Sequence, residues 1–175
     1  MSQPPQLGDH PFAIKEHESS FKHLDLRLHF SGQMVLSFVS RVPLHLDPAR
    51  PIKLVRVGDH KLDYLMLEWI IPPNRPGAGP TALWDDGFFR VVGNESMALQ
   101  LSRGRLRMDM SGKRLQGGFV LKWVGPQEND WLWVKEWDSF ADPFKRFPDV
   151  LTPGKIKELE MKQRRFKDSS SLELF

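Results

Sequence analysis

The stretch His23-Leu24-Asp25-Leu26-Arg27-Leu28-His29-Phe30 alternates polar and apolar residues without an exception. Successive side chains of a strand point to opposite faces, so this octet predicts a β-strand with two unlike faces. One face carries an apolar stripe fit for a core, made of Leu24, Leu26, Leu28 and Phe30. The other carries two imidazoles, a carboxylate and a guanidinium, which are groups that bind divalent metals and anions. A further histidine, His17, lies one short segment upstream.

Other short β-like runs follow the octet and are separated by glycine and proline. They cover residues 34–39, 52–57, 81–84, 88–92, 105–110, 118–124 and 131–135. Many short strands are typical of a sandwich or a barrel, so we expect a mainly β protein.

Two helices and one long loop are predicted between and after these strands. Residues 94–102 fit a short helix, and the proline- and glycine-rich segment 72–80 must be a loop because its prolines lack N–H donors. Thr152 and Pro153 fit an N-cap and a first helical position, which predicts a terminal helix to about Lys167. We expect the last residues, 168–175, to form a loosely held tail.

Length and composition favour one domain in the cytoplasm. The 175 residues are 40% hydrophobic and include no cysteine, which excludes disulfides and thiolate metal sites. No segment targets export or a membrane. We divide the chain into an N-terminal arm (1–11), a β-barrel domain (12–150) and a C-terminal basic helix with its tail (151–175). The net charge of +3 permits a polyanionic partner, although basic clusters are more often simply solvated faces.

His17, His23 and Asp25 are the candidate metal ligands. His23 and Asp25 lie two apart on one strand, so they can converge on a single divalent ion such as Mn²⁺, Fe²⁺ or Zn²⁺. A half-buried strand that shows its polar side to water explains the octet about equally well.

A second segment, Gly58-Asp59-His60-Lys61-Leu62-Asp63-Tyr64, adds a histidine and the only tyrosine of the chain. If the two segments meet, the metal supplies a Lewis acid, Arg27 neutralises anionic oxygens, and His60 offers a proton or a hydrogen bond. Such a set suits a phosphoester. Tyr64 either donates to a phosphate oxygen or only packs, and the local sequence favours neither.

These residues stand in a pattern that resembles the 3′-phosphoesterase domain of the bacterial DNA ligase D family, including its stand-alone relatives. The pattern is His, five residues, His-x-Asp-x-Arg, followed by Asp-His with a tyrosine four residues on. Further landmarks that resemble the family are Leu46-Asp47-Pro48, Ile71-Pro72, Gly77-Ala78-Gly79, Trp84-Asp85-Asp86-Gly87, Ser111 to Gly117 and Trp131 to Lys135.

The resemblance implies a small β-barrel whose concave polar side holds the site, and with the helices predicted above we expect short flanking helices and a C-terminal helix. It implies a metal-dependent enzyme, usually with manganese (Mn²⁺), that repairs DNA or DNA/RNA 3′ ends. Such enzymes remove a terminal ribonucleoside and then the remaining 3′-phosphate, which leaves a 3′-hydroxyl for a separate polymerase or ligase. His17, His23 and Asp25 would bind the metal, and Arg27, His60 and Tyr64 would hold the scissile phosphate.

Two other functions remain open from the residues. His23, Asp25 and His60 also fit the two-histidine, one-carboxylate triad of a non-haem iron oxygenase. Alternatively, a barrel with six tryptophans and basic clusters binds nucleic acid without catalysis.

Overall fold

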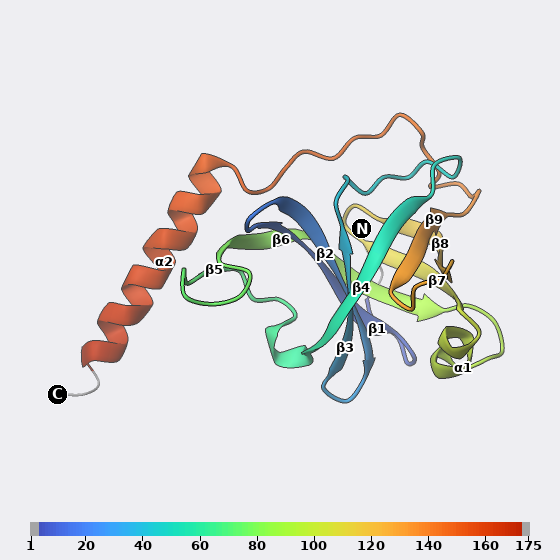
Figure 1. Ribbon diagram of the computed structural model, residues 1–175, viewed down its shortest axis with the longest axis horizontal. Helices are drawn as coiled ribbons and strands as arrows, with labels where there is room; N and C mark the ends of the chain where they lie inside the picture. The colour runs from blue at the N-terminus through green and yellow to red at the C-terminus, as the bar shows by residue number, and fades with distance from the viewer. Residues whose placement is uncertain (1–3, 173–175) are drawn as a thin grey trace.

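The computed structural model describes residues 4–172, and within them nine antiparallel strands form one sheet that closes on itself (Figure 1). The hydrogen-bonded order is β1-β2-β3-β4-β9-β8-β7-β6-β5, and a further pairing of β1 with β6 closes eight of the strands into a barrel. The short β5 lies outside the closed ring and pairs antiparallel with the first residues of β6. The strands are β1 (His10–Glu18), β2 (Lys22–Ser31), β3 (Met34–Ser40), β4 (Ile52–Lys61), β5 (Trp69–Ile71), β6 (Gly79–Val91), β7 (Arg105–Gly112), β8 (Gln116–Trp123) and β9 (Asp130–Lys135).

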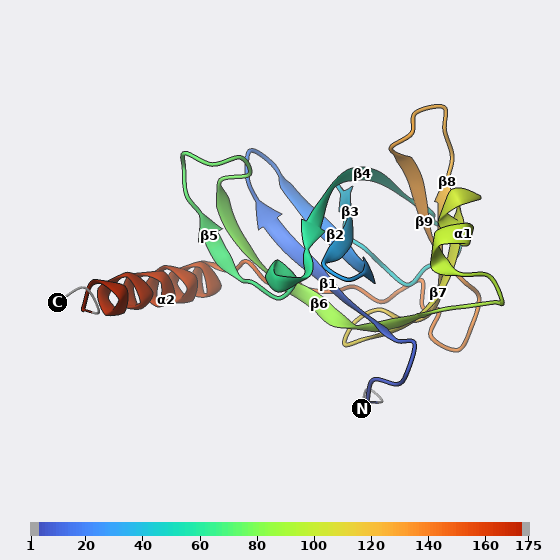
Figure 2. The same ribbon diagram turned by 90° about the horizontal axis from the view of Figure 1, so that it is seen from below.

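Three helical segments accompany the barrel. A single 3₁₀ turn, η1 (Leu62–Tyr64), follows β4, and α1 (Met97–Ser102) precedes β7. The long α2 (Pro153–Leu172) projects away from the barrel and is held near β5, as both views show (Figures 1 and 2). Within residues 4–172, no helix combines the length and the apolar character that crossing a membrane requires. The expected mainly β architecture, a small barrel with a C-terminal helix, is confirmed.

The apolar stripe of the octet fills the barrel, as the alternation predicted. Leu26 and Leu28 on β2 are fully buried among aromatic and aliphatic side chains from the surrounding strands. Phe38 of β3 meets Trp131 of β9 edge to face, and Phe119 of β8 stacks on Trp133 of β9. Because the interior is packed with side chains, the polar face of β2 must do its chemistry on the outside of the barrel.

The first strand, β1, was missed by the sequence analysis. Its burial does not alternate, since six consecutive residues from Phe12 to His17 are buried. Phe12 and Ile14 face the barrel core, whereas Ala13 packs against Val35 and Leu65 on the opposite face. A strand covered on both faces lacks the polar–apolar period that identifies a half-exposed strand.

Residues 81–84 and 88–92 were predicted as separate strands, but β6 runs through both without a break. The intervening Asp85-Asp86-Gly87 has the composition of a turn. Here the Asp85 carboxylate accepts hydrogen bonds from the backbone N–H groups of Asp86, Lys113, Arg114 and Leu115. These bonds tie the β7–β8 connection to the middle of β6, so the polar residues belong to the strand.

The helix boundaries also differ from those expected. Ser96 caps α1 by accepting from the N–H of Leu99, so this helix begins at Met97 rather than near Asn94. The expected tail from Asp168 is wrong over its first five residues, since α2 continues to Leu172. No glycine or proline follows Lys167 to stop the helix. Residues 173–175 of that tail lie outside the described residues.

Candidate metal centre

Strand register places the polar groups of β1 and β2 side by side on the face opposite the core. His17 pairs with His23 across the two strands, and Lys15 pairs with Asp25. Residues directly opposite each other in an antiparallel pair point to the same face. On the next strand, Ser37 of β3 pairs with Arg27. One outer surface of the barrel therefore carries these six side chains, together with His60 from β4, which lies near Arg27.

The three predicted ligands form a compact cluster. One ligand atom from each of His17, His23 and Asp25 lies within 4.8 Å of the others, and all three residues are buried. Nδ1 of His17 is 3.3 Å from Oδ2 of Asp25, and Nε2 of His23 is 3.4 Å from Oδ1. Two imidazoles and a carboxylate at this separation can converge on one divalent ion.

The second nitrogen of each imidazole is fixed by a backbone carbonyl. Nε2 of His17 donates to the carbonyl oxygen of Gly77 at 2.6 Å, and Nδ1 of His23 donates to that of Phe21 at 3.0 Å. The nitrogens that remain, Nδ1 of His17 and Nε2 of His23, are the ones that face Asp25. In neutral rings these atoms carry lone pairs, and lone pairs beside a carboxylate require a proton or a cation between them. The donor set and its outer hydrogen bonds therefore fit a metal ion.

The pKa shifts within the cluster also fit a bound cation. Burial acts to raise the pKa of Asp25, but hydrogen bonds from His17 and His23 and the charge of Arg27 hold that pKa well below its usual range. Burial acts to lower the pKa of His23, and interaction with Asp25 outweighs it, so this pKa is raised. The carboxylate is thus ionised at neutral pH and attracts positive charge into the cluster.

Arg27, Ser37 and His60 form a second group beside the ligands. Nη2 of Arg27 is 3.9 Å from Asp25, and its buried Nε has no hydrogen-bond partner within residues 4–172. Nδ1 of His60 is 2.7 Å from the Ser37 hydroxyl. Burial and the charge of Arg27 both lower the pKa of His60, so its imidazole is mainly neutral at pH 7. This group offers unused donors to an anion next to the metal.

Tyr64 reaches the site through its backbone rather than through a contact of its ring. Its side chain is 54% exposed, whereas its carbonyl oxygen accepts from Nζ of Lys15 at 2.9 Å. Lys15 is only 2% exposed, and burial lowers the pKa of its amine to about 7. The structure thus joins four of the predicted residues closely, brings His60 in through Ser37, and leaves Tyr64 more than half exposed.

Three participants were missed from the sequence as members of the site. Ser37 and Lys15 lie on strands where the register decides which side chains meet, and that register is not visible in the sequence. The carbonyl of Gly77 comes from the predicted loop 72–80, and the signal for it was its place in the Gly77-Ala78-Gly79 landmark.

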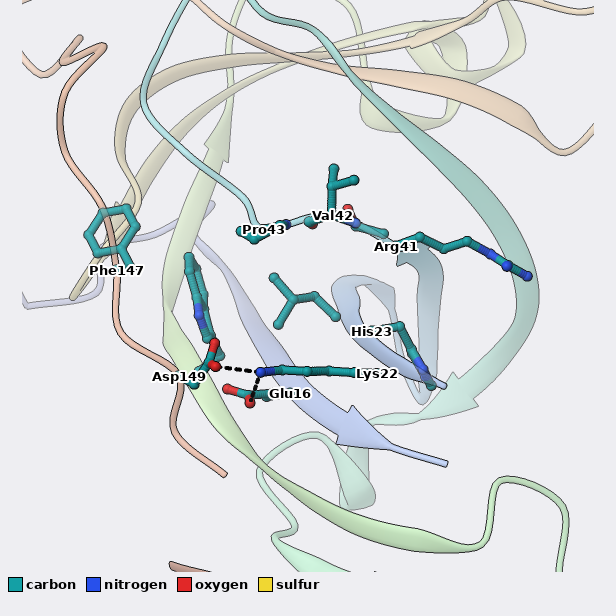
Figure 3. Close-up of a pocket in the computed structure, with 11 residues that line it drawn as sticks. Glu16, Lys22, His23, Arg41, Val42, Pro43, Phe147 and Asp149 are labelled. Carbon is teal, nitrogen blue, oxygen red and sulfur yellow. Dashed lines mark hydrogen bonds and ion pairs between the residues drawn. The ribbon is translucent and has the colours of Figure 1, made fainter. Parts of the chain in front are cut away.

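A cavity of about 290 Å³ lies between the start of β2 and the segment 147–149 (Figure 3). Figure 3 shows His23 and Arg41 extending to one side, while Lys22 extends to the other toward Glu16 and Asp149. Of the predicted site residues, only His23 lines the cavity. The cavity therefore adjoins the cluster of His17, His23 and Asp25 but does not enclose it.

Comparison with known proteins agrees with the geometry. The sequence profile of the DNA Ligase D 3′-phosphoesterase domain matches residues 15–122, which include all six predicted site residues. The chain belongs to this family. The matched range contains His17, His23 and Asp25, which form the cluster described above.

Relatives of this phosphoesterase domain are much longer proteins. The multifunctional non-homologous end joining protein LigD of Pseudomonas aeruginosa is 32% identical over 142 residues, which is 80% of this chain and 16% of the relative. The protein of the same name from Mycolicibacterium smegmatis is 29% identical over 93% of this chain and 22% of the relative. The corresponding DNA repair protein of Mycobacterium tuberculosis strain H37Rv is 30% identical over 93% and 21%. The chain spans about a fifth of their length.

Proposed function

We propose that this protein is a metal-dependent phosphoesterase that processes DNA or DNA/RNA 3′ ends, removing terminal ribonucleosides and 3′-phosphates. The observation that carries the proposal is the buried cluster of His17, His23 and Asp25 with the unused donors of Arg27 beside it. The family match supports the reaction class, which is phosphoester hydrolysis. The 3′-hydroxyl left behind would serve a repair polymerase or ligase.

The residues divide the work between holding a metal and holding a phosphate. His17, His23 and Asp25 would hold the ion, for which we propose Mn²⁺, and the ion would supply a Lewis acid at the phosphoryl oxygens. Arg27 binds the anionic oxygens and offsets the charge that grows on them as the ester bond breaks. Neutral His60, oriented by Ser37, hydrogen-bonds an oxygen of the same phosphate. The Tyr64 hydroxyl contributes one more donor once a substrate covers it.

The geometry does not favour the iron oxygenase alternative. That triad needs His60 as the third ligand, but the cluster that forms within residues 4–172 uses His17 instead. His60 has its Nδ1 engaged by Ser37 and lies on β4, two strands away from the β2 strand that carries His23 and Asp25.

The decisive experiment offers the purified protein a DNA strand that ends in a 3′-phosphate. With Mn²⁺ we expect inorganic phosphate to be released, and with Fe²⁺ and a 2-oxo acid we expect no oxygen consumption. His23→Ala should lower turnover by about a hundredfold or more because it removes a ligand. It should also abolish Mn²⁺ binding in calorimetry.

His29→Ala is the matched control. His29 lies on the same polar side of β2, but its imidazole bonds to the Gly32 carbonyl and is not part of the cluster. We expect near wild-type turnover from it. Retained turnover in His23→Ala would contradict the ligand role of His23. DNA binding without turnover in every protein tested, wild type included, would favour a pure nucleic-acid-binding barrel.

A further inference from the structure

A column of planar groups leads from the metal cluster to the surface. The rings of His17 and His23 are 4.6 Å apart, and the ring of Phe21 lies 4.7 Å from that of His23. The guanidinium carbon of Arg41 then lies 4.4 Å above the Phe21 ring. Phe21 comes from the β1–β2 turn and Arg41 from the end of β3, so two separate elements build the outer end of the column.

Hydrogen bonds hold the backbone of Phe21 in place although the residue lies in a turn. Its carbonyl accepts from Nδ1 of His23 and from the backbone N–H of Ser19. The residue is nevertheless 40% exposed, which is unusual for a phenylalanine that serves only packing. The aromatic ring therefore holds Arg41 at a fixed height beside the metal ligand.

Arg41 is exposed and has no carboxylate partner within residues 4–172. Several other arginines pair with a carboxylate, for example Arg50 with Asp47 and Arg90 with Asp9. A guanidinium over an aromatic ring can present its outer face for stacking, and nucleobases stack on such planes. Single-stranded nucleic acid is commonly held in this way.

The space next to Arg41 can accommodate a planar ligand. The cavity of about 290 Å³ is lined by Arg41 together with the apolar Val42 and Pro43, and Figure 3 shows all three on its rim. Its volume is near the lower end of the range found for ligand pockets, roughly 300–1,000 Å³. Its far wall is closed by the ion pairs of Lys22 with Glu16 and Asp149.

We propose that Phe21 and Arg41 form a nucleobase-stacking subsite, which holds a base of the strand whose 3′ end enters the metal cluster. The inference rests on the proposed function and adds where the DNA strand is bound. Stacking on the Phe21–Arg41 pair fixes the base, and the neighbouring phosphate then lies beside His23 and Arg27. Neither residue needs to touch the reacting atoms for this role.

The test measures binding without turnover, in the presence of EDTA, by fluorescence anisotropy on a duplex with a 3′-phosphate end. Phe21→Leu and Arg41→Lys should each raise the Kd about tenfold, since base stacking is worth on the order of 1–3 kcal/mol. Arg41→Lys keeps the charge and loses the plane. Phe21→Tyr keeps the ring and should bind as wild type, as should the control Arg105→Lys on β7, across the barrel.

Two modified duplexes, abasic at the last or at the next-to-last nucleoside, identify the stacked base. With one of them the wild type should bind about tenfold more weakly, and the two loss variants should then equal the wild type. Wild-type affinity in Arg41→Lys overturns the subsite, because charge alone then suffices. Losses that persist on both abasic duplexes overturn it as well, because the variants then act by displacing His23.

The same preparation distinguishes this proposal from the function on which it rests. Phosphate release by the wild type in Mn²⁺, together with unaltered binding by Arg41→Lys, refutes the subsite and leaves the phosphoesterase function standing. No phosphate release by the wild type refutes the function itself.

Discussion

Nε2 of His17 lies 2.6 Å from the carbonyl oxygen of Gly77, which joins the first strand to a loop sixty residues further along the chain. The bond fixes which nitrogen of His17 carries its proton and so which one faces Asp25. The loop thereby becomes a part of the candidate metal centre although it contributes none of the three clustered side chains.

Gly77→Ala should weaken Mn²⁺ binding by about tenfold. Gly77 has a φ of +74°, and an added Cβ would lie 3.2 Å from Cε1 of His17, so the loop or the imidazole must shift. Calorimetric titration with Mn²⁺ measures the change. Gly8→Ala is the control, since Gly8 has a φ of +90° and nothing within 4 Å of the added Cβ. An equal loss in both variants would show that backbone strain alone is responsible.

The pKa of His60 should be below 6.5 in the metal-free protein, and that of His23 above it. Burial and the charge of Arg27 lower the former, while Asp25 raises the latter against burial. NMR titration of the imidazole Cε1 protons gives both values. Arg27→Gln should move the pKa of His60 upward, because a positive neighbour is removed.

The lowered pKa of His60 has a defined effect on stability. Between its folded and unfolded pKa values, the unfolded state binds more protons than the folded state. The contribution of His60 to the free energy of unfolding is therefore full above about pH 6.5 and falls as the pH drops through that value. Urea melts at pH 7.5 and 5.5 measure the free energy of unfolding of wild type and of His60→Gln. The change between the two pH values should be smaller in the variant.

Lys15→Met should leave the free energy of unfolding unchanged or raise it, yet loosen η1. The buried amine has its pKa lowered to about 7, so at and below pH 7 the folded protein carries a poorly hydrated charge. Any gain in stability should be largest there and should shrink as the pH rises toward 10. Loss of the bond to the Tyr64 carbonyl should speed hydrogen exchange at Leu65 and Leu67, whose N–H groups bond within this turn.

Lys135→Met serves as the control for Lys15→Met. Lys135 is equally buried, but its amine donates to two carbonyls and to Asp138. Its removal leaves these acceptors unpaired, and we expect a loss of about 2 kcal/mol without a change of exchange in η1. A parallel response of the two variants would contradict the tethering role of Lys15.

Asp85→Asn should destabilise the protein by about 3 kcal/mol. The carboxylate accepts four backbone N–H groups, and an amide in its place would turn a donor toward some of them. Asp86→Asn is the neighbour for comparison. Asp86 pairs with the exposed Lys113, so its loss should cost at most about 1 kcal/mol. Chemical denaturation of both variants at pH 7 measures the two losses in free energy of unfolding. Similar losses would contradict the stabilising role of the hydrogen bonds to the Asp85 carboxylate.

The sequence by itself determined the local pattern of this protein. The alternation from His23 to Phe30 was sufficient to predict β2, to assign its apolar stripe to the core and to present its polar residues as ligands, because a strand has a period of two. The prolines and glycines of the 72–80 segment were sufficient to predict a loop, although its last two residues, Gly79 and Pro80, begin β6 and pair with β5. The motif that includes His17, His60 and Tyr64 was sufficient to indicate the family.

Only the tertiary structure decided which of these groups meet. Strand β1 is covered on both faces and carries no readable period, so the pairing of His17 with His23 and of Lys15 with Asp25 came from register. Closure of the barrel packed its interior and moved the chemistry to the outer face. The Gly77 carbonyl, the Ser37 hydroxyl and the Phe21–Arg41 pair join segments distant in sequence. Such contacts depend on how the whole sheet closes, which short-range preferences do not specify.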